Sequence, residues 1–231
     1  MQNTVRGDSK SPLIKRPQRL ADEVYKHLYG RLMSLAIAPG SRILIDNLVK
    51  EMGVSHTPNR EALSRLEAQG LVVQTHLVGY SAASQLDPSK LVKLFDMRLQ
   101  LEPFAAGQAA LHITDEAAAN LQDINQSMQE IESSELRGRF LDFAQSDGEL
   151  HDLIARMADN ELIHEALQRL HTHVHLFRLF YLPSATKEVN AEHAEIVHAI
   201  GRRNEAAAAA AMRAHLDKSK RRFLAQCGEK P

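Results

Sequence analysis

Four ionisable side chains of this 231-residue chain fall on helix faces that are otherwise apolar, and they could bind a metal ion together. They are Asp147, His151, His193 and His215. Successive residues of an α-helix are rotated by about 100°, so each of these four residues lies on the same helix face as Ile, Val, Ala or Met side chains. Burying such groups without partners would cost several kcal/mol. A divalent cation would satisfy them together, because imidazoles and carboxylates are good metal ligands.

The spacing of the two later histidines supports this interpretation. His193 and His215 are symmetric about residue 204, close to the turn expected at 201–204. In an antiparallel helical hairpin they therefore stand level with each other. The sequence predicts one divalent metal ion per chain.

Other histidines form competing patterns. Two Glu-x-x-His motifs, at 161–164 and 195–198, are typical of di-iron carboxylate bundles. The Glu and His side chains of both motifs lie on helix faces away from the neighbouring apolar residues, so we interpret them as surface pairs. His171, His173 and His175 cannot all share one helix face, and we expect them mostly to face solvent or a partner, with the alternative that one of them lines the cavity.

The elements that would carry these residues are all helical. From Pro88 onward the pattern shows only helices separated by turn residues. Six are expected, at about 88–111, 115–135, 138–158, 160–181, 186–201 and 203–225. Helices of this length predict an all-α antiparallel bundle over 88–226.

The N-terminal part has a different organisation. Residues 1–17 are polar and expected to be disordered. A helix from Leu20, a short helix at 45–52, a third helix at 57–69 and a hairpin at 71–81 follow in order. This is the order of a winged helix-turn-helix, predicted over 18–80 and joined to the bundle by a linker at 81–87. The predicted fold is therefore mainly α.

The third helix has the features of a recognition helix. Thr57 is the expected N-cap and Pro58 the expected first helical residue, so polar side chains gather at a tip that can enter a major groove. Arg60 is expected to contact a guanine edge, with a salt bridge to Glu61 or Glu67 as the alternative. The candidate DNA-binding residues are Ser55, His56, Thr57, Asn59, Arg60 and Arg65 on this segment, with His76 and Gly79 in the wing.

The stretch IAPGSRI, followed by NLVKEMGVSHTPNREALSRLEAQGLV, resembles the DNA-binding unit of the GntR family of bacterial transcription regulators. The resemblance covers about residues 18–80. His56 stands where the family usually has arginine, and Asn59 where it usually has valine. The first difference replaces a permanent cation by an imidazole.

A second resemblance covers about residues 88–222. The residues that carry it are Arg98, Leu101, Glu102, Asp147, His151, Asn160, Glu192, His193, Met212, His215 and Leu216. This pattern is similar to the FCD ligand-binding domain of the FadR branch, in the shorter, VanR-like variety with six helices. The resemblance implies a metal, often zinc or nickel, held by Asp147, His151, His193 and His215, with a small carboxylate effector above it. It also implies that Arg98 meets the effector carboxylate; the alternative is a salt bridge to Glu102.

The resemblances imply a homodimeric regulator that binds a palindromic operator in double-stranded DNA, responds to a small organic acid and is more commonly a repressor. One alternative is the same DNA-binding protein with a purely structural metal and no effector. Another is a metal-dependent enzyme, disfavoured because no convincing general base lies beside the predicted ligands.

Composition fits these expectations without deciding between them. Residues 1–80 hold 11 Lys and Arg against 7 Asp and Glu, and the remainder holds 17 against 22. The basic N-terminal part suits a polyanionic partner. The single cysteine, Cys227, has no intramolecular partner, and the sequence contains neither a secretory leader nor a long apolar run. We expect a soluble protein of the bacterial cytoplasm, associated with the nucleoid and not with a membrane.

Overall fold

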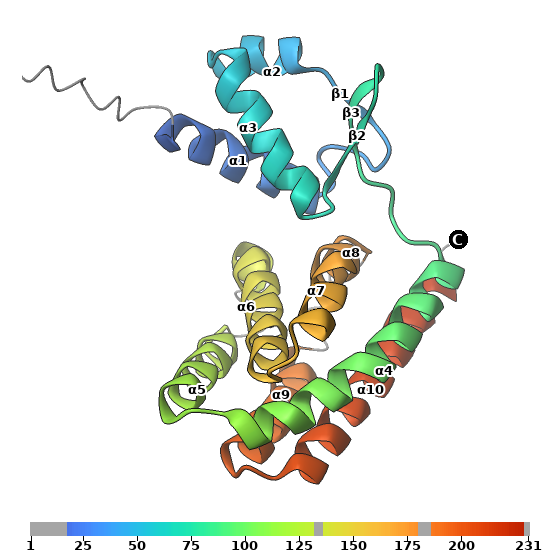
Figure 1. The fold of residues 1–231 in the computed structure, drawn as a ribbon. Helices are drawn as coiled ribbons and strands as arrows, with labels where there is room; N and C mark the ends of the chain where they lie inside the picture. The colour runs from blue at the N-terminus through green and yellow to red at the C-terminus, as the bar shows by residue number, and fades with distance from the viewer. Residues whose placement is uncertain (1–17, 132–135, 180–185, 229–231) are drawn as a thin grey trace, which may run out of the picture.

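The computed structural model describes residues 18–131, 136–179 and 186–228, and it has the mainly α fold that the sequence predicts (Figure 1). The segment predicted to be disordered, 1–17, lies outside the described residues. A small unit with three helices and a sheet is followed by a bundle of helices. No described helix is long and apolar enough to cross a membrane.

The N-terminal unit contains three helices and three short strands. They are α1 (Gln18–Met33), β1 (Arg42–Ile43), α2 (Ile45–Met52), α3 (His56–Ala68), β2 (Val72–Thr75) and β3 (Gly79–Ala82). The antiparallel sheet has the order β1-β3-β2. The hairpin of β2 and β3 is the predicted one, whereas β1, only two residues long, was not predicted. Leu28, Leu63 and Leu66 are fully buried where α1 packs on α3.

The turn between α2 and α3 sets where the recognition helix begins. Gly53 has a φ of +65°, and its N–H donates to the Val49 carbonyl, which ends α2 in a left-handed cap. Helix α3 then begins at His56 with Ser55 as its N-cap. The prediction that Thr57 is the N-cap and Pro58 the first helical residue is therefore wrong by two positions. Pro58 is still tolerated, because N–H groups in the first turn have no partner within the helix.

The bundle contains seven helices in its described residues. They are α4 (Pro88–His112), α5 (Asp115–Gln129), α6 (Leu136–Met157), α7 (Glu161–Arg169), α8 (Thr172–Leu179), α9 (Thr186–Gly201) and α10 (Glu205–Gly228). Four of these helices follow a residue whose side chain accepts a hydrogen bond from the first turn: Asp87, Thr114, Asn160 and Asn204. The buried core is formed mainly by apolar side chains of α4, α5, α6, α9 and α10.

The prediction of six helices is wrong at one place. The single helix expected over 160–181 is divided into α7 and α8, because His171 has a φ of +45° and interrupts the helical backbone. This break changes the direction of the chain and therefore the side to which the following histidines point.

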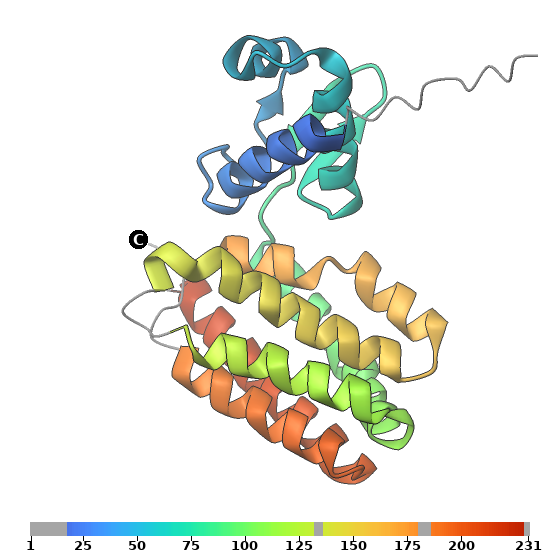
Figure 2. The ribbon, with the colours of Figure 1, turned by 90° about the vertical axis from the view of Figure 1, so that its left-hand side faces the viewer.

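The two units touch through α8. His171 lies against Gly70, where an added Cβ would come within 2.6 Å of the imidazole. Ala144 of α6 and Val174 of α8 pack against the apolar core of the N-terminal unit. Figure 2 shows α6 and α8 on the side of the bundle nearest to that unit. A movement of α8 would therefore reach the N-terminal unit directly.

Candidate DNA interface and candidate metal centre

The N-terminal end of α3 and the tip of the wing both lie on the side of the N-terminal unit that faces away from the bundle (Figure 1). Ser55, His56, Thr57 and Arg60 are exposed there. The free N–H groups of the first helical turn and an exposed guanidinium form a surface suited to DNA phosphates and base edges. His56 Nε2 lies 3.6 Å from Asp46 Oδ1, so an acidic side chain already neighbours the position where the family usually has arginine.

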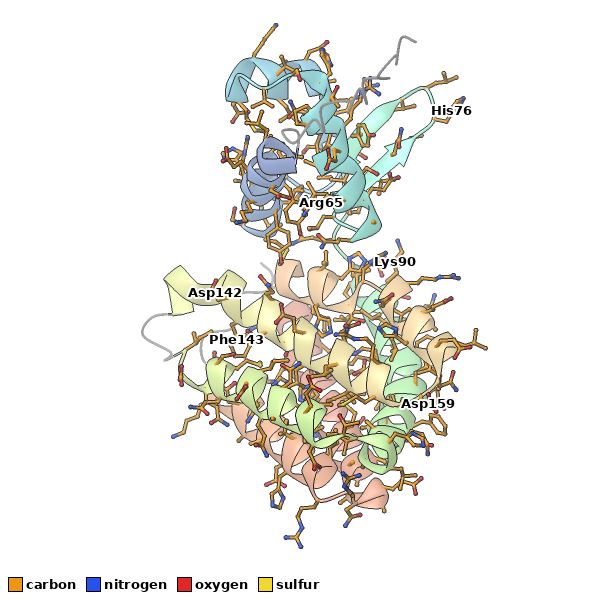
Figure 3. The ribbon with its side chains drawn as sticks, turned by 60° about the vertical axis from the view of Figure 1, so that its left-hand side comes forward. Arg65, His76, Lys90, Asp142, Phe143 and Asp159 are labelled. Carbon is orange, nitrogen blue, oxygen red and sulfur yellow. The ribbon has the colours of Figure 1, made fainter. Side chains whose placement is uncertain are left out.

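The wing presents its predicted residues at the hairpin turn. His76 is exposed at the tip of the hairpin (Figure 3). Gly79 has a φ of +102°, a conformation that favours glycine, and it starts the returning strand. Both positions are compatible with the predicted contact to a groove or backbone.

Asn59 does not belong to this surface. It is fully buried, and its Nδ2 donates to the carbonyl oxygens of Val54 and Ser55, each at 2.9 Å. The prediction that Asn59 contacts DNA is therefore wrong: its side chain points back and braces the turn between α2 and α3.

Arg65 is also separated from the helix tip. Its Nη1 lies 2.5 Å from Asp22 Oδ1, and its guanidinium carbon lies 4.3 Å from the centroid of the Tyr25 ring. Both partners belong to α1, so Arg65 holds α1 against α3. The prediction that it binds DNA is not supported by this position (Figure 3).

Because Arg60 is exposed and Asn59 is buried, substitutions of these two neighbouring residues should have different effects. Arg60→Ala should weaken operator binding by about 10-fold or more, since loss of a good base contact costs roughly 1–3 kcal/mol, and it should leave the melting temperature unchanged. Asn59→Ala should lower the melting temperature, because it removes two buried hydrogen bonds. Electrophoretic mobility shift and thermal denaturation check both; unchanged affinity for Arg60→Ala would contradict the assigned contact.

The bundle brings three predicted metal ligands together. His151 of α6, His193 of α9 and His215 of α10 are buried, and one nitrogen of each lies within 4.8 Å of the others. Their ring centroids are 4.7 to 5.5 Å apart. Three separate helices thus converge on one point in the core.

Several nitrogens in this cluster have no hydrogen-bond partner. They are His151 Nε2 and both ring nitrogens of His193. Buried polar atoms without partners are rare in folded proteins, and each requires an explanation. A metal ion bound by His151 Nε2 and by one of the two His193 nitrogens supplies one for those two atoms, so the residues present fit the metal that the sequence predicts.

Two buried carboxylates orient the imidazoles. Glu102 Oε2 lies 2.7 Å from His151 Nδ1, and Glu192 Oε2 lies 2.9 Å from His215 Nδ1. A carboxylate on one ring nitrogen fixes the tautomer and leaves the other nitrogen free to ligate, an arrangement common around protein-bound metals. Neither glutamate is predicted from the sequence as a group that orients an imidazole.

The electrostatics keep the acids charged and the imidazoles neutral. Burial alone would raise the pKa of Glu102, but Arg98 and His151 hold it well below its usual range. Burial also opposes ionisation of Glu192, whose hydrogen bonds from Arg222 and His215 lower its pKa to about 2. Burial lowers the pKa of His193 to about 3, with His215 acting in the same direction. Neutral imidazole is the form that binds metal.

Asp147 lies at the edge of the cluster and has a partner that was not predicted. Its Oδ1 is 3.4 Å from His193 Nε2, and its Oδ2 is 2.6 Å from Nδ1 of His173 on α8. The His173 ring also lies 5.1 Å from that of His151. His173 therefore matches the alternative, that one of these histidines lines the cavity, and not the main expectation of a solvent- or partner-facing residue, because the break at His171 turns α8 toward the cluster.

Arg98 lies in the same buried region. It is 2% exposed, its Nε donates to Glu102 Oε1, and its Nη2 donates to Glu102 Oε2 at 3.1 Å. The salt bridge given as the alternative is thus present. Contact of Arg98 with an effector stays a prediction.

The two Glu-x-x-His motifs lie outside the cluster. Glu195 and His198 are exposed, as is Glu161. His164 Nε2 lies 2.7 Å from Asp152 Oδ1, away from the three imidazoles. The interpretation of these motifs as pairs outside the metal site agrees with these positions.

A cavity of about 630 Å³ opens beside the cluster. It is lined by Glu102, His151 and His173 of the bundle and by Tyr29, Ala68 and Gln69 of the N-terminal unit. A small molecule in this space would contact both units of the protein.

The carboxylate beside His215 offers a test of the metal site. Glu192→Gln should lower metal affinity by about 10-fold to 100-fold, the usual effect of removing such an orienting group. Glu195→Gln, three residues along α9 and exposed, should leave it unchanged. Competition with a chromogenic chelator measures both, and equal affinities for the two variants would refute the role of Glu192.

A winged helix-turn-helix joined to a helical bundle is the architecture of a DNA-binding regulator. Residues 20–80 match the model of the bacterial regulatory proteins of the gntR family, and residues 93–218 match the FCD domain. The chain therefore belongs to the GntR family of transcription regulators, in the group that carries an FCD domain.

Known relatives agree with this assignment. The Nta operon transcriptional regulator of Aminobacter aminovorans is 28% identical over 187 residues, covering 80% of this chain and 86% of the relative. The regulator LutR of Bacillus subtilis is 28% identical over 202 residues, covering 78% and 90%. These relatives are transcription regulators, which removes the enzyme alternative.

The fold also has a solved counterpart. The structure of E. coli McbR/YncC superposes on this chain with a TM-score of 0.69 and 20% sequence identity. The superposition covers 90% of this chain and 98% of the McbR/YncC chain. This likeness supports the fold of both units and their order along the chain.

Proposed function

We propose that this protein is a homodimeric regulator that senses a small carboxylate through a divalent metal in its helical domain. The observation that carries the proposal is the buried cluster of His151, His193 and His215, with ring nitrogens that lack partners. Two winged helices related by a two-fold axis would bind a palindromic operator, with repression as the expected outcome. Binding to operator DNA would locate the protein at the nucleoid, in the bacterial cytoplasm.

One metal ion per chain, zinc or nickel, would be held by the three imidazoles and Asp147. Nitrogen ligands suit both metals. When bound, the metal supplies a Lewis acid that attracts a carboxylate oxygen. Glu102 and Glu192 keep the ligating imidazoles in one tautomer and orientation.

Arg98 is the residue most suited to a second contact with the effector. Its guanidinium is buried in the same part of the bundle and bound to Glu102, which itself lines the cavity. A planar guanidinium can bind a carboxylate in bidentate fashion. The cavity volume of about 630 Å³ is in the range of small-molecule sites.

Contacts around α8 support a route from this site to the DNA-binding unit. His173 contacts Asp147, and His171, two residues earlier, lies against Gly70 at the end of the recognition-helix segment. A ligand acts only if it binds one arrangement of the two units more tightly than the other. A ligand that changes the Asp147–His173 contact would therefore bias the position of α3. The connection through 81–87 provides a second route.

A screen of small carboxylic acids tests the proposal. In thermal denaturation, at least one acid should raise the melting temperature of the metal-loaded protein, because ligand that binds only the folded state stabilises it by mass action. At 100 times its Kd the gain is about 2.7 kcal/mol. The same acid should have no effect after the metal is removed with a chelator, and it should change operator affinity.

The controls separate sensing from a structural role. Arg98→Lys keeps the charge but loses the planar fork, so it should weaken the response to the acid while retaining the metal. Should metal removal unfold the protein while no acid alters either melting temperature or operator binding, the metal is structural and the sensing proposal is wrong.

A further inference from the structure

The tip of the wing carries the most exposed large apolar side chain among the described residues. Leu77 is 94% exposed, whereas Leu162, the next in this respect, is 73% exposed. The neighbouring Val78 is 53% exposed. A single exposed leucine is ordinary and requires no explanation. Leu77 does require one, because its backbone conformation disfavours a leucine as well.

The turn that holds Leu77 is one that glycine would fit better. The Val78 N–H donates to the Thr75 carbonyl at 3.0 Å, which closes a tight turn over His76 and Leu77. Leu77 has a φ of +61°, in the left-handed region where a side chain crowds its own backbone. Glycine would make the same turn with less strain, so the turn itself does not account for the leucine. Backbone strain of this kind is concentrated at functional sites.

The wing tip lies on the DNA-facing side of the N-terminal unit. Figure 3 shows His76, the residue before Leu77, at the end of the hairpin, away from the bundle. The N-terminal end of α3 lies on the same side of the unit (Figure 1). Because the two grooves alternate along a duplex, a recognition helix in the major groove leaves the wing beside the neighbouring minor groove. Leu77 is therefore continuous with the candidate DNA interface.

The charges around the tip suit a polyanion. No acidic residue occurs in the sequence between Glu67 and Asp87, so the hairpin brings no carboxylate of its own toward the phosphates. Arg42 Nη2 donates to the Val78 carbonyl at 2.7 Å, which braces the turn and places a cation behind the tip. The negative potential of a minor groove attracts arginine. An apolar tip with a cation behind it fits this groove, whereas a purely apolar protein surface would gain nothing from the guanidinium.

We propose that Leu77 is an apolar wedge that enters the minor groove next to the sequence read by α3 and opens one base step. Minor-groove proteins frequently insert leucine or similar side chains between base pairs, which unstacks the step and kinks the duplex toward the major groove. Pyrimidine–purine steps such as TA and CA/TG kink most easily. The wedge thus adds a preference for a flexible step to the bases that α3 reads. The proposal rests on operator binding through α3, which Arg60→Ala tests separately.

Binding to a selected duplex tests the contact. The duplex is the sequence that the wild-type protein enriches from a random library. Leu77→Asn and Leu77→Gly both suit a positive φ, so they should melt at or above the wild-type temperature. Both should weaken binding by about 10-fold or more, the factor that burial of a leucine side chain contributes. Leu77→Met keeps an apolar side chain and should bind like the wild type, as should Val73→Thr, which changes a half-exposed valine away from the tip.

Fluorescence of 2-aminopurine tests the wedge itself. The base analogue is placed in turn at each step of the flanking minor groove, and protein is added to saturation so that differences in affinity do not matter. At one step the wild type and Leu77→Met should raise the emission, because unstacking relieves quenching, and Leu77→Asn should not. Energy transfer between dyes at the duplex ends should report a kink of about 20° or more with the wild type and a straighter duplex with Leu77→Asn.

Each outcome has a distinct meaning. Equal affinity of the wild type and Leu77→Asn would refute the contact and leave recognition by α3 intact. Reduced affinity of Leu77→Asn, with 2-aminopurine emission and end-to-end distance the same as for the wild type, would also overturn the wedge, because Leu77 would then lie only against the backbone. A wild-type protein that enriches no sequence would refute operator binding, and the wedge with it.

Discussion

The structure of the helical domain depends on the burial of three imidazoles at one point of its core. His151, His193 and His215 come from three helices and lie among apolar side chains, with ring nitrogens that the protein itself does not satisfy. Burial of unpaired polar atoms is destabilising. A bound metal ion would satisfy these nitrogens and complete the fold. The neighbouring carboxylates Glu102 and Glu192 fix the orientation of His151 and His215 for such a metal.

Helix α4 connects several parts of this arrangement. Glu102 binds His151 and Arg98 on its inner side, and the helix begins directly after the connection from the DNA-binding unit. Helix α8 makes the complementary connection, since His173 meets Asp147 while its neighbour His171 meets Gly70. The histidine cluster is thus connected to the DNA-binding unit in two ways, through α4 and through α8. A DNA-binding regulator in which a ligand controls operator affinity needs such contacts.

Much of this could be predicted from the sequence where a residue lies on a long, regular stripe. His193 and His215 were assigned to the core because the surrounding Ile, Val, Ala and Met residues fix the helical phase. Helical phase gives the wrong face where the backbone departs from a regular helix. His173 was placed outside the site because the positive φ of His171 starts a new helix with a different phase. Asn59 is predicted at the DNA surface because the pattern makes Pro58 the first helical residue, whereas α3 begins two residues earlier, at His56, and Asn59 turns inward.

Other misses have similar causes. Strand β1 has only two residues and no alternation that a pattern could detect. The partners of Arg65 and the carboxylates that orient the imidazoles are tertiary contacts, which depend on how helices pack and not on local spacing. The resemblance to known families supplied the ligand set and the DNA-binding unit, whereas the contacts of Arg98, Asn59 and His173 required the structure.

The most direct test of the account is the metal content of protein purified without a histidine tag. Elemental analysis should find about one divalent ion per chain in the wild type, and His193→Ala should lose it while retaining a helical circular dichroism spectrum. A wild-type protein that is folded, binds its operator and contains no stoichiometric metal even after incubation with zinc or nickel would contradict the account.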